Sequence, residues 1–403
     1  MRQNLDKDIL NRIQYLVGSA ETVEAMVDAP AKEPFAEDVL DFLNDVSRRI
    51  MRSPAARAFS DVITFGFWLR RASTAQLKER FARADGDIHL GRGVAFHIAP
   101  SNVPVNFGFS LVAGLLTGNR NVVRVPSKPF PQVDVIVGAI NAALEDRPAL
   151  RPYIVLARYE RSKEINDLLS GIADTRIVWG GDATIAELRR SPLPPRSTEI
   201  TFADRYSLAV IDSDAYLAVG DRKAVAQDFY NDTYFSDQNA CTSPRIVVWV
   251  GGQKAAAREA FWAELHALVR EKYTFQPIQG INKLTSGYLI AVREPGTKLE
   301  PRGDNLVVRA TVPEITDYLM DLKDNSGYFF EYDCDDILEL KPLCDDKRCQ
   351  TIGLLGDARL LEPLLRSGIR GVDRVAPLGK TMDFDMIWDG YDLVGQLTRT
   401  IKL

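Results

Sequence analysis

The chain has 403 residues, enough for two domains, and its 46% hydrophobic and 26% charged residues are typical of an ordinary soluble globular protein. A formal net charge of −5 and an isoelectric point near 5.5 exclude a broad cationic surface for nucleic acid or acidic lipid. Four cysteines form no disulfide framework, the charged N-terminus is not a signal peptide and no apolar run is long enough to cross a bilayer, so we expect a cytoplasmic protein.

About the first 85 residues are predicted to be helical, because Val39, Leu43, Val46 and Ile50 recur on one helical face. From about residue 91, short apolar runs alternate with amphipathic stretches. The runs predicted as strands are 93–100, 121–127, 152–159, 175–181 and 207–212. The stretches predicted as helices are 133–145 and 163–173. This alternation predicts a mostly parallel sheet that is covered by helices on both faces.

The alternation resumes after Cys241. A strand is predicted over 245–251, a long helix over 253–272 and a strand over 305–311, with 313–323 next in the helical position. The sequence therefore predicts two α/β units in succession, with a boundary near 210–220.

Glycines occur in only one place that suits a nucleotide. There is no G-x-x-x-x-G-K-[ST], and no G-x-G-x-x-G between a strand and a helix. Gly180 and Gly181 do follow a predicted strand and precede a predicted helix. Glycines at such a turn let the backbone approach a ligand, but a tight turn without a ligand explains them equally well.

Metal-binding patterns are missing from the sequence. The histidines lie far apart, and three of the cysteines lack the paired C-x-x-C spacing of a zinc site. We therefore predict no metal site and interpret these three cysteines as structural filler. The residues concerned are His89, His97, His266, Cys334, Cys344 and Cys349.

Cys241 differs from the other cysteines. It follows the polar residues 237–239 and precedes Thr242-Ser243-Pro244, just before a predicted strand. Reactive groups tend to lie on such loops, and backbone N–H groups there can stabilise a thiolate. From these residues alone, a nucleophile and a small core side chain remain equally open interpretations.

A second segment, residues 97–128, bears on this choice. A predicted strand ends at Pro100, Asn102 lies on a turn between prolines, and an apolar helix and a second strand follow. A side-chain amide at the end of a strand can donate a hydrogen bond to an oxyanion. The alternative is a turn asparagine with a local backbone hydrogen bond.

Four blocks of the sequence carry a family resemblance. They are HIAPSNVPV (97–105), WGGDATI (179–185), SDQNACTSP (236–244) and RVAPLGKTMDFDMIWDGYDLV (374–394). The first resembles the cofactor segment of the aldehyde dehydrogenase superfamily. In this order, the four resemble the bioluminescence-type long-chain acyl-CoA reductases (LuxC family), from about residue 90 to the end.

The resemblance implies residue roles. Cys241 would attack the acyl carbon, and the Asn102 amide with the N–H of Cys241 would hold the oxyanion. Attack on acyl-CoA exchanges one thioester for another, and a hydride from a reduced nicotinamide then yields the aldehyde. The family's cofactor segment implies binding residues, namely Pro100, Ser101, Arg124, Ser127, Lys128, Gly180 and Gly181.

Two departures from the superfamily refine this reading. Aldehyde-oxidising relatives carry a glutamate in an E-L-G-G-K-type stretch, and here Glu199 is the nearest carboxylate, out of register, which favours reduction over hydrolysis. NAD-dependent relatives often end the second strand with K-P-S-E, whereas this chain has Lys128 at the glutamate position and Arg124 close by. A cation there can pair with a 2′-phosphate, so we predict NADPH.

The sequence thus predicts an aldehyde-dehydrogenase-like α/β fold, in which two domains with mostly parallel sheets flank a cleft. The expected parts are a helical and NADP-binding part (1–210), a catalytic domain (211–389) and a tail (390–403) that pairs across a subunit interface of a homo-oligomer. The predicted function is reduction of acyl-CoA, or another activated acyl group, to an aldehyde. An acyltransferase, a thioesterase and a non-catalytic acyl-binding subunit are the alternatives. The resemblance also implies an acyl-protein synthetase as a partner.

Overall fold

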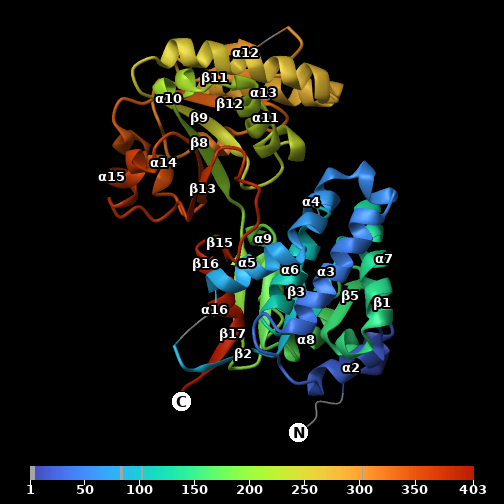
Figure 1. Cartoon of the computed structure of the whole chain (residues 1–403). Coiled ribbons are helices and arrows are strands. Elements are labelled where there is room, and N and C mark those ends of the chain that lie inside the picture. Colours follow the sequence, from blue (N-terminus) through green and yellow to red (C-terminus); the bar gives the residue numbers. More distant parts are fainter. Residues whose placement is uncertain (1–4, 82–84, 101–102, 302) are drawn as a thin grey trace. The chain divides into compact units, whose positions relative to one another are not determined.

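The computed structural model describes residues 5–81, 85–100, 103–301 and 303–403 (Figure 1). Contacts divide the chain into two compact units, which we call unit 1 (Met1–Ala203 with Met386–Leu403) and unit 2 (Asp204–Asp385). The first division lies a few residues before the expected 210, because the strand at 206–212 pairs with strands of unit 2. The second lies just before residue 386, so the C-terminal segment belongs to unit 1. The roles assigned to the two parts stay predictions.

Unit 1 is built on a six-stranded sheet in the order β1-β5-β4-β3-β6-β7. Strand β1 is antiparallel to β5, and the other neighbours are parallel. The strands are β1 (Gln14–Val17), β3 (Val94–Ile98), β4 (Arg120–Arg124), β5 (Ile154–Arg158), β6 (Thr175–Trp179) and β7 (Thr198–Phe202). The connecting helices are α6 (Asn106–Leu116), α7 (Pro131–Asp146), α8 (Lys163–Gly171) and α9 (Asp182–Leu188). The predicted strands and helices of this region are confirmed.

The N-terminal region is helical with one exception. Its helices are α1 (Lys7–Leu10), α2 (Ala20–Asp28), α3 (Glu37–Arg52), α4 (Ser60–Trp68) and α5 (Arg71–Phe81), with a 3-10 turn at Ala55–Ala58. The predicted apolar face of α3 is buried. The exception is β1, where a helix was expected. Gly18, with φ of 82°, ends this strand, and Ser19 then caps α2.

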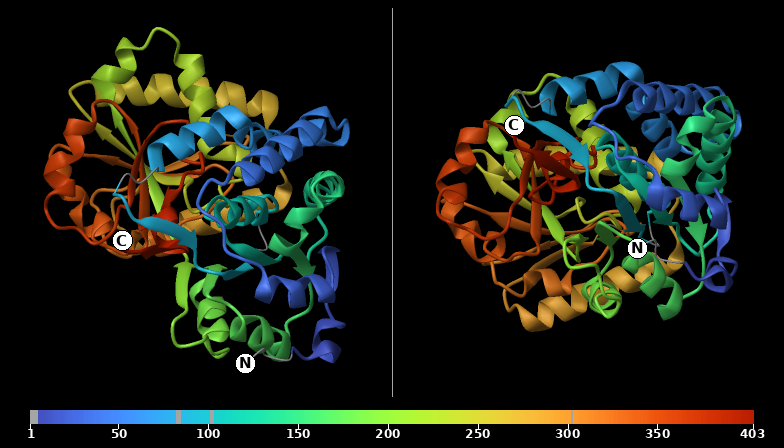
Figure 2. Two further views of the ribbon diagram at one scale, coloured as in Figure 1. Left: turned by 60° about the horizontal axis from the view of Figure 1, so that its bottom comes forward. Right: turned by 90° about the horizontal axis from the view of Figure 1, so that it is seen from below.

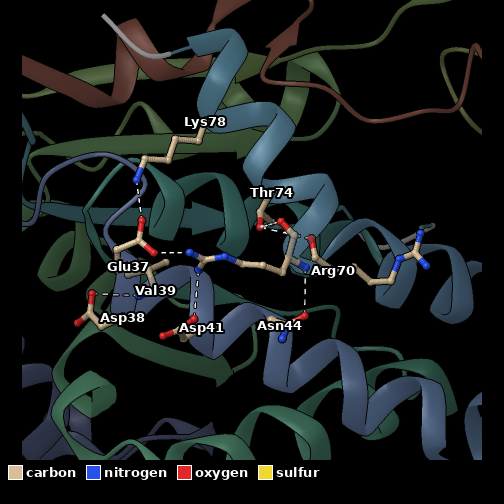
Figure 3. A network of polar contacts seen from close by, with 9 residues as sticks. Glu37, Asp38, Val39, Asp41, Asn44, Arg70, Thr74 and Lys78 are labelled. Carbon is tan, nitrogen blue, oxygen red and sulfur yellow. Dashed lines mark hydrogen bonds and ion pairs between the residues drawn. The ribbon is translucent and has the colours of Figure 1, made fainter.

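A surface network ties α5 to α3 (Figure 3). Glu37 accepts from Lys78 at 2.7 Å and from Arg71, which also donates to Asp41 at 3.1 Å. The backbone N–H of Arg71 donates to Asn44 Oδ1 at 3.1 Å. These side chains are partly exposed, so each ion pair contributes less than about 1 kcal/mol. The network orients α5 more than it stabilises the unit.

Unit 2 is built on a seven-stranded sheet in the order β10-β11-β12-β9-β8-β13-β14, with β10 antiparallel and the other neighbours parallel. The strands are β8 (Tyr206–Asp212), β9 (Pro244–Val250), β10 (Lys298–Pro301), β11 (Val308–Thr311), β12 (Tyr328–Asp333), β13 (Cys349–Leu355) and β14 (Arg374–Pro377). The helices are α10 (Ser213–Ala218), α11 (Arg222–Asp232), α12 (Lys254–Lys272), α13 (Pro277–Arg293), α14 (Lys341–Cys344) and α15 (Glu362–Leu365). Both units together confirm the predicted α/β class.

Two elements of unit 2 differ from expectation. Helix α13 was not predicted at all. The stretch 313–323, expected to be helical, contains only the 3-10 turn at Leu319–Leu322. The chain enters this stretch still bound to the sheet, because the N–H of Val312 donates to Glu331 O at 2.9 Å.

The C-terminal segment returns to unit 1. It forms a small hairpin, β15 (Ile387–Trp388) with β16 (Tyr391–Asp392), then α16 (Leu393–Leu397) and β17 (Thr398–Ile401). Strand β17 pairs antiparallel with β2 (Ile88–Gly91), and Figure 2 shows the red strand beside the light-blue one. Pairing of this tail across a subunit interface stays a prediction. Among the described residues, no helix combines the length and apolarity that crossing a bilayer requires.

Candidate active site

The predicted cofactor residues of unit 1 gather at one edge of its sheet. Strands β4, β3 and β6 are parallel neighbours, so their carboxyl ends lie together. The chain order runs outward from β3 in both directions, which makes the β3–β6 junction a topological switch point, where α/β sheets bind ligands. The residues at this edge are Pro100 after β3, Arg124, Ser127 and Lys128 at and after β4, and Gly180 and Gly181 after β6. Ser101 and Asn102 lie outside the described residues.

The two cations predicted to contact a 2′-phosphate differ in their surroundings. The Arg124 guanidinium donates to Tyr159 O at 3.2 Å and lies 4.7 Å from the centre of the Tyr159 ring. Lys128 is exposed, with Nζ 5.2 Å from the centre of the Phe130 ring, and Ser127 is exposed beside it. Lys128 and Ser127 are therefore accessible from solvent, whereas the Arg124 guanidinium is already engaged with Tyr159.

The glycine pair has a packing role in this structure. Trp179 stacks on Phe202 at 3.7 Å, and the N–H of Gly180 donates to Phe202 O at 3.1 Å. A β-carbon on Gly180 would lie 3.2 Å from Thr184 Cγ2, closer than ordinary contact. This close contact favours a small residue at 180, so Gly180 does not by itself indicate a cofactor.

A buried polar network that the sequence analysis missed supports the same edge. His97 of β3 bonds through Nδ1 to Ser110 Oγ at 2.7 Å and through Nε2 to Asn121 Oδ1 at 3.0 Å. The Trp179 indole N–H donates to Ser110 Oγ at 2.9 Å. Burial lowers the pKa of His97 to about 4, so the ring is neutral at pH 7. The network connects β3, α6, β4 and β6 just behind the predicted cofactor residues.

The Glu199 carboxylate forms ion pairs with two arginines. On β7 it accepts from Arg176 Nε at 2.9 Å and from Arg189 Nε at 2.8 Å. Burial raises the pKa of Glu199, but the hydrogen bonds from Arg189 and Arg176 outweigh burial and lower it overall. A carboxylate held by two guanidinium groups is a poor general base. This agrees with the departure from the hydrolytic pattern noted in the sequence.

Cys241 lies in unit 2, in the loop between the 3-10 turn at Tyr234–Ser236 and β9. Of residues 240–250, it is the one that is not buried. Its carbonyl accepts from Ser207 Oγ at 2.8 Å, which ties the loop to β8. The side chain is therefore neither packed away in the core nor on a loosely held loop.

Arg245 and Gln238 fix the backbone around Cys241. Arg245 is buried and donates to Asp324 O at 2.8 Å, to the Asn325 side chain and to Gln238 O. Burial lowers the pKa of Arg245 to about 10, and a negative charge on Cys241 opposes that change. Arg245 and Cys241 therefore lie close enough for their charges to interact.

The Gln238 side chain completes this support. Its Oε1 accepts from the N–H of Gly327 at 2.7 Å, and its Nε2 donates to Pro244 O at 3.1 Å. Asp237 and Gln238 both have left-handed backbone angles, with φ of 54° and 52°, which non-glycine residues adopt rarely. The visible signal in the sequence was an arginine and a glutamine flanking the cysteine, but some of their partners, such as Asn325 and Tyr328, lie 80 and 90 residues further on.

The C-terminal block that starts at residue 374 also meets this loop. The Asp232 carboxylate, at the end of α11, accepts from the N–H of Gly379 at 2.6 Å and of Thr381 at 3.1 Å. Thr242 Oγ1 lies 3.2 Å from Met382 Sδ. Burial raises the pKa of Asp232 to about 6. Asp232 therefore anchors the 379–382 loop, which packs beside the residue that follows Cys241.

The other three cysteines are buried thiols. Burial raises the pKa of Cys334 to about 12. A hydrogen bond with Cys344, and then burial, raises that of Cys349. Neither is therefore a thiolate at neutral pH. Within the described ranges, no cluster of three His, Cys, Asp or Glu side chains could hold a metal ion.

A cavity of about 500 Å³ in unit 1 contains none of the predicted site residues. It is lined by Asn44, Ser47, Arg48, Met51, Arg52, Arg70, Arg71 and Ala72. Cavity size alone therefore does not locate the chemistry in this chain.

The chain is similar in sequence to several long-chain acyl-protein thioester reductases. The long-chain acyl-protein thioester reductase of Aliivibrio fischeri is 26% identical over 161 residues, covering 40% of this chain and 32% of that protein. The enzyme of the same name from Photorhabdus laumondii is 22% identical over 303 residues, covering 72% of this chain and 58% of that protein. The chain thus spans about a third to somewhat over half of these relatives' lengths.

Solved structures share the fold. The 1-pyrroline-5-carboxylate dehydrogenase of Thermus thermophilus is 13% identical with a TM-score of 0.62, covering 94% of this chain and 83% of that chain. A benzaldehyde dehydrogenase from Corynebacterium glutamicum is 15% identical with a TM-score of 0.62, covering 94% and 88%. The predicted aldehyde-dehydrogenase-like fold is therefore confirmed. Residues 32–282, more than half of the chain, match the family described as acyl-CoA reductase (LuxC), and the chain belongs to that family.

Proposed function

We propose that this protein reduces a long-chain fatty acyl thioester to the aldehyde with NADPH, through a thioester on Cys241. The observation that carries the proposal is the placement of Cys241. It is the partly exposed thiol in a buried run, beside a buried guanidinium, while the other cysteines are sealed in the core. Family membership and the names of the related enzymes agree with this chemistry.

In the first step, the Cys241 sulfur attacks the acyl carbon. A new carbon–sulfur bond forms, the bond to the donor's sulfur breaks, and the donor leaves as a thiolate. The two thioesters have similar energies, so the step needs no strong base. Arg245 lies close enough for its charge to interact with the attacking thiolate, and the hydrogen bonds from Arg245 and Ser207 hold the loop in place. The Asn102 amide is proposed to donate to the oxyanion.

A reduced nicotinamide cofactor, held by Ser127 and Lys128 at the carboxyl edge of the unit 1 sheet, supplies a hydride when bound. The acyl carbon is reduced to a thiohemiacetal on Cys241, which releases the aldehyde and regenerates the thiolate. One acyl thioester, one NADPH and one proton give one aldehyde, one thiol and NADP⁺. The pairing of Glu199 with Arg176 and Arg189 leaves no ready carboxylate at that position to direct water onto the acyl-enzyme.

The acyl donor is either acyl-CoA, named by the family, or a protein-bound acyl group, named by the relatives. If a protein delivers the acyl group, an acyl-protein synthetase is the natural partner. A homo-oligomer in which the tail contributes to an interface remains part of this proposal.

The direct test follows nicotinamide absorbance and product together. With a long-chain acyl-CoA, the purified chain should consume NADPH and form aldehyde in equal amounts. Mass spectrometry without NADPH should find the acyl group on Cys241, where a thioester accumulates because the reduction cannot proceed.

Cys241→Ala should lose both the adduct and NADPH consumption, while Cys334→Ala, a change to a buried thiol in the same unit, should keep both. Acyl release without NADPH consumption would instead identify an acyltransferase or a thioesterase. Equal adducts on wild type and Cys241→Ala would refute the nucleophile, and noncovalent binding alone would identify an acyl-binding subunit.

A further inference from the structure

The solvent-facing side of α13 is apolar along its whole length. Among the residues that the structure describes, fourteen large hydrophobic side chains are exposed, and six of them belong to this one helix. Their exposed fractions run from 55% for Leu289 to 83% for Val292. We call these six side chains the α13 face, and they are Ile278, Ile281, Leu284, Tyr288, Leu289 and Val292.

The spacing of these residues makes one continuous stripe. At 100° per residue, positions 278, 281, 284, 288, 289 and 292 fall within an arc of about 140°, so they lie on one side of the helix, with Thr285 among them. The side that packs against unit 2 is formed by Lys283, Gly287 and Ile290. The apolar stripe therefore points away from the core of its own unit, the reverse of an ordinary amphipathic surface helix.

A buried lysine is one of the residues that hold helix α13 in place, together with Gln279 and Ser286, which bond to Asp237 and Asp324. Lys283 Nζ donates to Ser326 O at 2.7 Å and to Asn305 O, and it lies 4.9 Å from the centre of the Phe275 ring. Burial of Ile290 adds a small apolar contact. The outward orientation of the stripe is thus fixed by polar contacts on the opposite side of the helix.

The α13 face has almost no charge. Residues 277–292 contain one charged residue, Lys283, and it is on the buried side. Arg293, at the end of the helix, lies 5.2 Å from the centre of the Tyr318 ring. A helix that binds an anionic membrane surface carries lysines and arginines beside its apolar stripe, and this one does not. Two copies of an uncharged stripe can approach without repulsion.

The area of the face suits a partner of protein size. Side chains of this kind, more than half exposed, present about 100 Å² each, so the six together present about 600 Å². That reaches the upper end of the patches usual on monomers, about 300–600 Å². It also approaches the roughly 800 Å² that each partner buries in a stable dimer.

We propose that the α13 face is a self-association surface, where α13 of one copy packs antiparallel against α13 of a second copy. A two-fold interface places the same patch on both subunits, and its axis passes near the middle of the stripe. The middle residue of Pro277–Arg293 is Thr285, whose small side chain lets the two helices approach closely. Position 278 of one copy then lies opposite position 292 of the other.

The first experiment measures the mass of the full chain by sedimentation equilibrium. The double variant Ile281→Asp/Tyr288→Asp should halve the assembly mass and leave the circular dichroism spectrum unchanged. Phe67→Asp, at a 51% exposed side chain of α4, should keep the wild-type mass. A monomeric wild type at micromolar concentration, or an unchanged mass in the double variant, would overturn the proposal.

The second experiment tests the geometry by disulfide trapping. Thr285→Cys should give an interchain disulfide under mild oxidation, because two copies of this position meet at the axis. Val292→Cys alone should give none, since its two copies lie about 21 Å apart along antiparallel helices. The double variant Ile278→Cys/Val292→Cys should restore the crosslink. A crosslink at 292 alone, without one at 285, would show that the antiparallel pairing is wrong.

Discussion

The carboxyl edge of the unit 1 sheet and the Cys241 loop of unit 2 are built on different principles. At the edge, the order of parallel strands brings together residues from three places in the chain. Backbone hydrogen bonds between the strands position these residues. Around Cys241, buried side chains of Arg245, Gln238 and Asp232 hold loops by hydrogen bonds to backbone groups. The first arrangement should tolerate single substitutions that the second does not.

The largest effect is expected at Arg245. Arg245→Met removes the donor to Gln238 O, Asp324 O and the Asn325 side chain, and leaves buried acceptors without partners. At about 1–3 kcal/mol for each unsatisfied group, the free energy of unfolding should fall by about 3–5 kcal/mol. The rate of Cys241 acylation should also fall, and mass spectrometry of stopped reactions measures this rate. The control Arg270→Met, at an exposed arginine of α12, should change neither the free energy of unfolding nor the acylation rate. If the two variants behave alike, Arg245 does not support the Cys241 loop.

The second effect concerns the buried network behind the unit 1 edge. The pKa of His97 is about 4 in the folded chain and about 6.5 when unfolded, so the unfolded state binds a proton that the folded state excludes. Stability should therefore fall as pH drops from about 6.5 to 4, by about 3 kcal/mol from this group at 1.36 kcal/mol per pKa unit. Urea unfolding of wild type and His97→Gln at both ends of this window isolates the contribution. The stability advantage of wild type should shrink in acid, and a constant difference between the two would show that His97 does not titrate as proposed.

A smaller effect is expected where the C-terminal block meets the cysteine loop. Asp232→Ala leaves the N–H groups of Gly379 and Thr381 without their acceptor, at a cost of about 2 kcal/mol. Because Met382 packs beside Thr242, kcat for the acyl substrate should fall while KM for NADPH stays constant. Asn231→Ala, one residue earlier on α11, is the matched control for steady-state kinetics. Loss of NADPH affinity in Asp232→Ala would contradict this positioning role.

The smallest effect is expected at the tolerant edge itself. Lys128→Glu reverses the charge nearest the proposed 2′-phosphate and should raise KM for NADPH about tenfold, equivalent to 1.4 kcal/mol, with little change for NADH. Lys223→Glu makes the same charge change on an exposed lysine of α11 and should alter neither. If KM rises equally for NADPH and NADH, Lys128 does not distinguish the two cofactors.

The strands and helices of unit 1 that follow simple hydrophobic patterns could be predicted from the sequence. The alternation of apolar runs and amphipathic stretches was sufficient to find β3 to β6 and their helices, because parallel strands are buried on both faces. The polar run around Cys241 marked it as different from the other cysteines but left open whether it was a core side chain, and the structure shows that Cys241 is partly exposed while the other three are buried. Arg245 and His97 could not be interpreted from the sequence, since their partners come from distant segments. Helix α13 was missed because Gly280, Gly287 and an apolar stripe facing solvent do not follow the pattern of a surface helix.

The pairing of β2 with β17 has a consequence for how the chain is made. Unit 2 is inserted between two segments of unit 1, so the strand that completes β2 leaves the ribosome after all of unit 2 has been synthesised. Until then, the open edge of β2 is a template for other strands. Unit 2, whose residues are contiguous, can fold before β17 has been synthesised and paired with β2. The pairing of β2 with β17 is therefore one of the last contacts of unit 1 to form as the chain is synthesised.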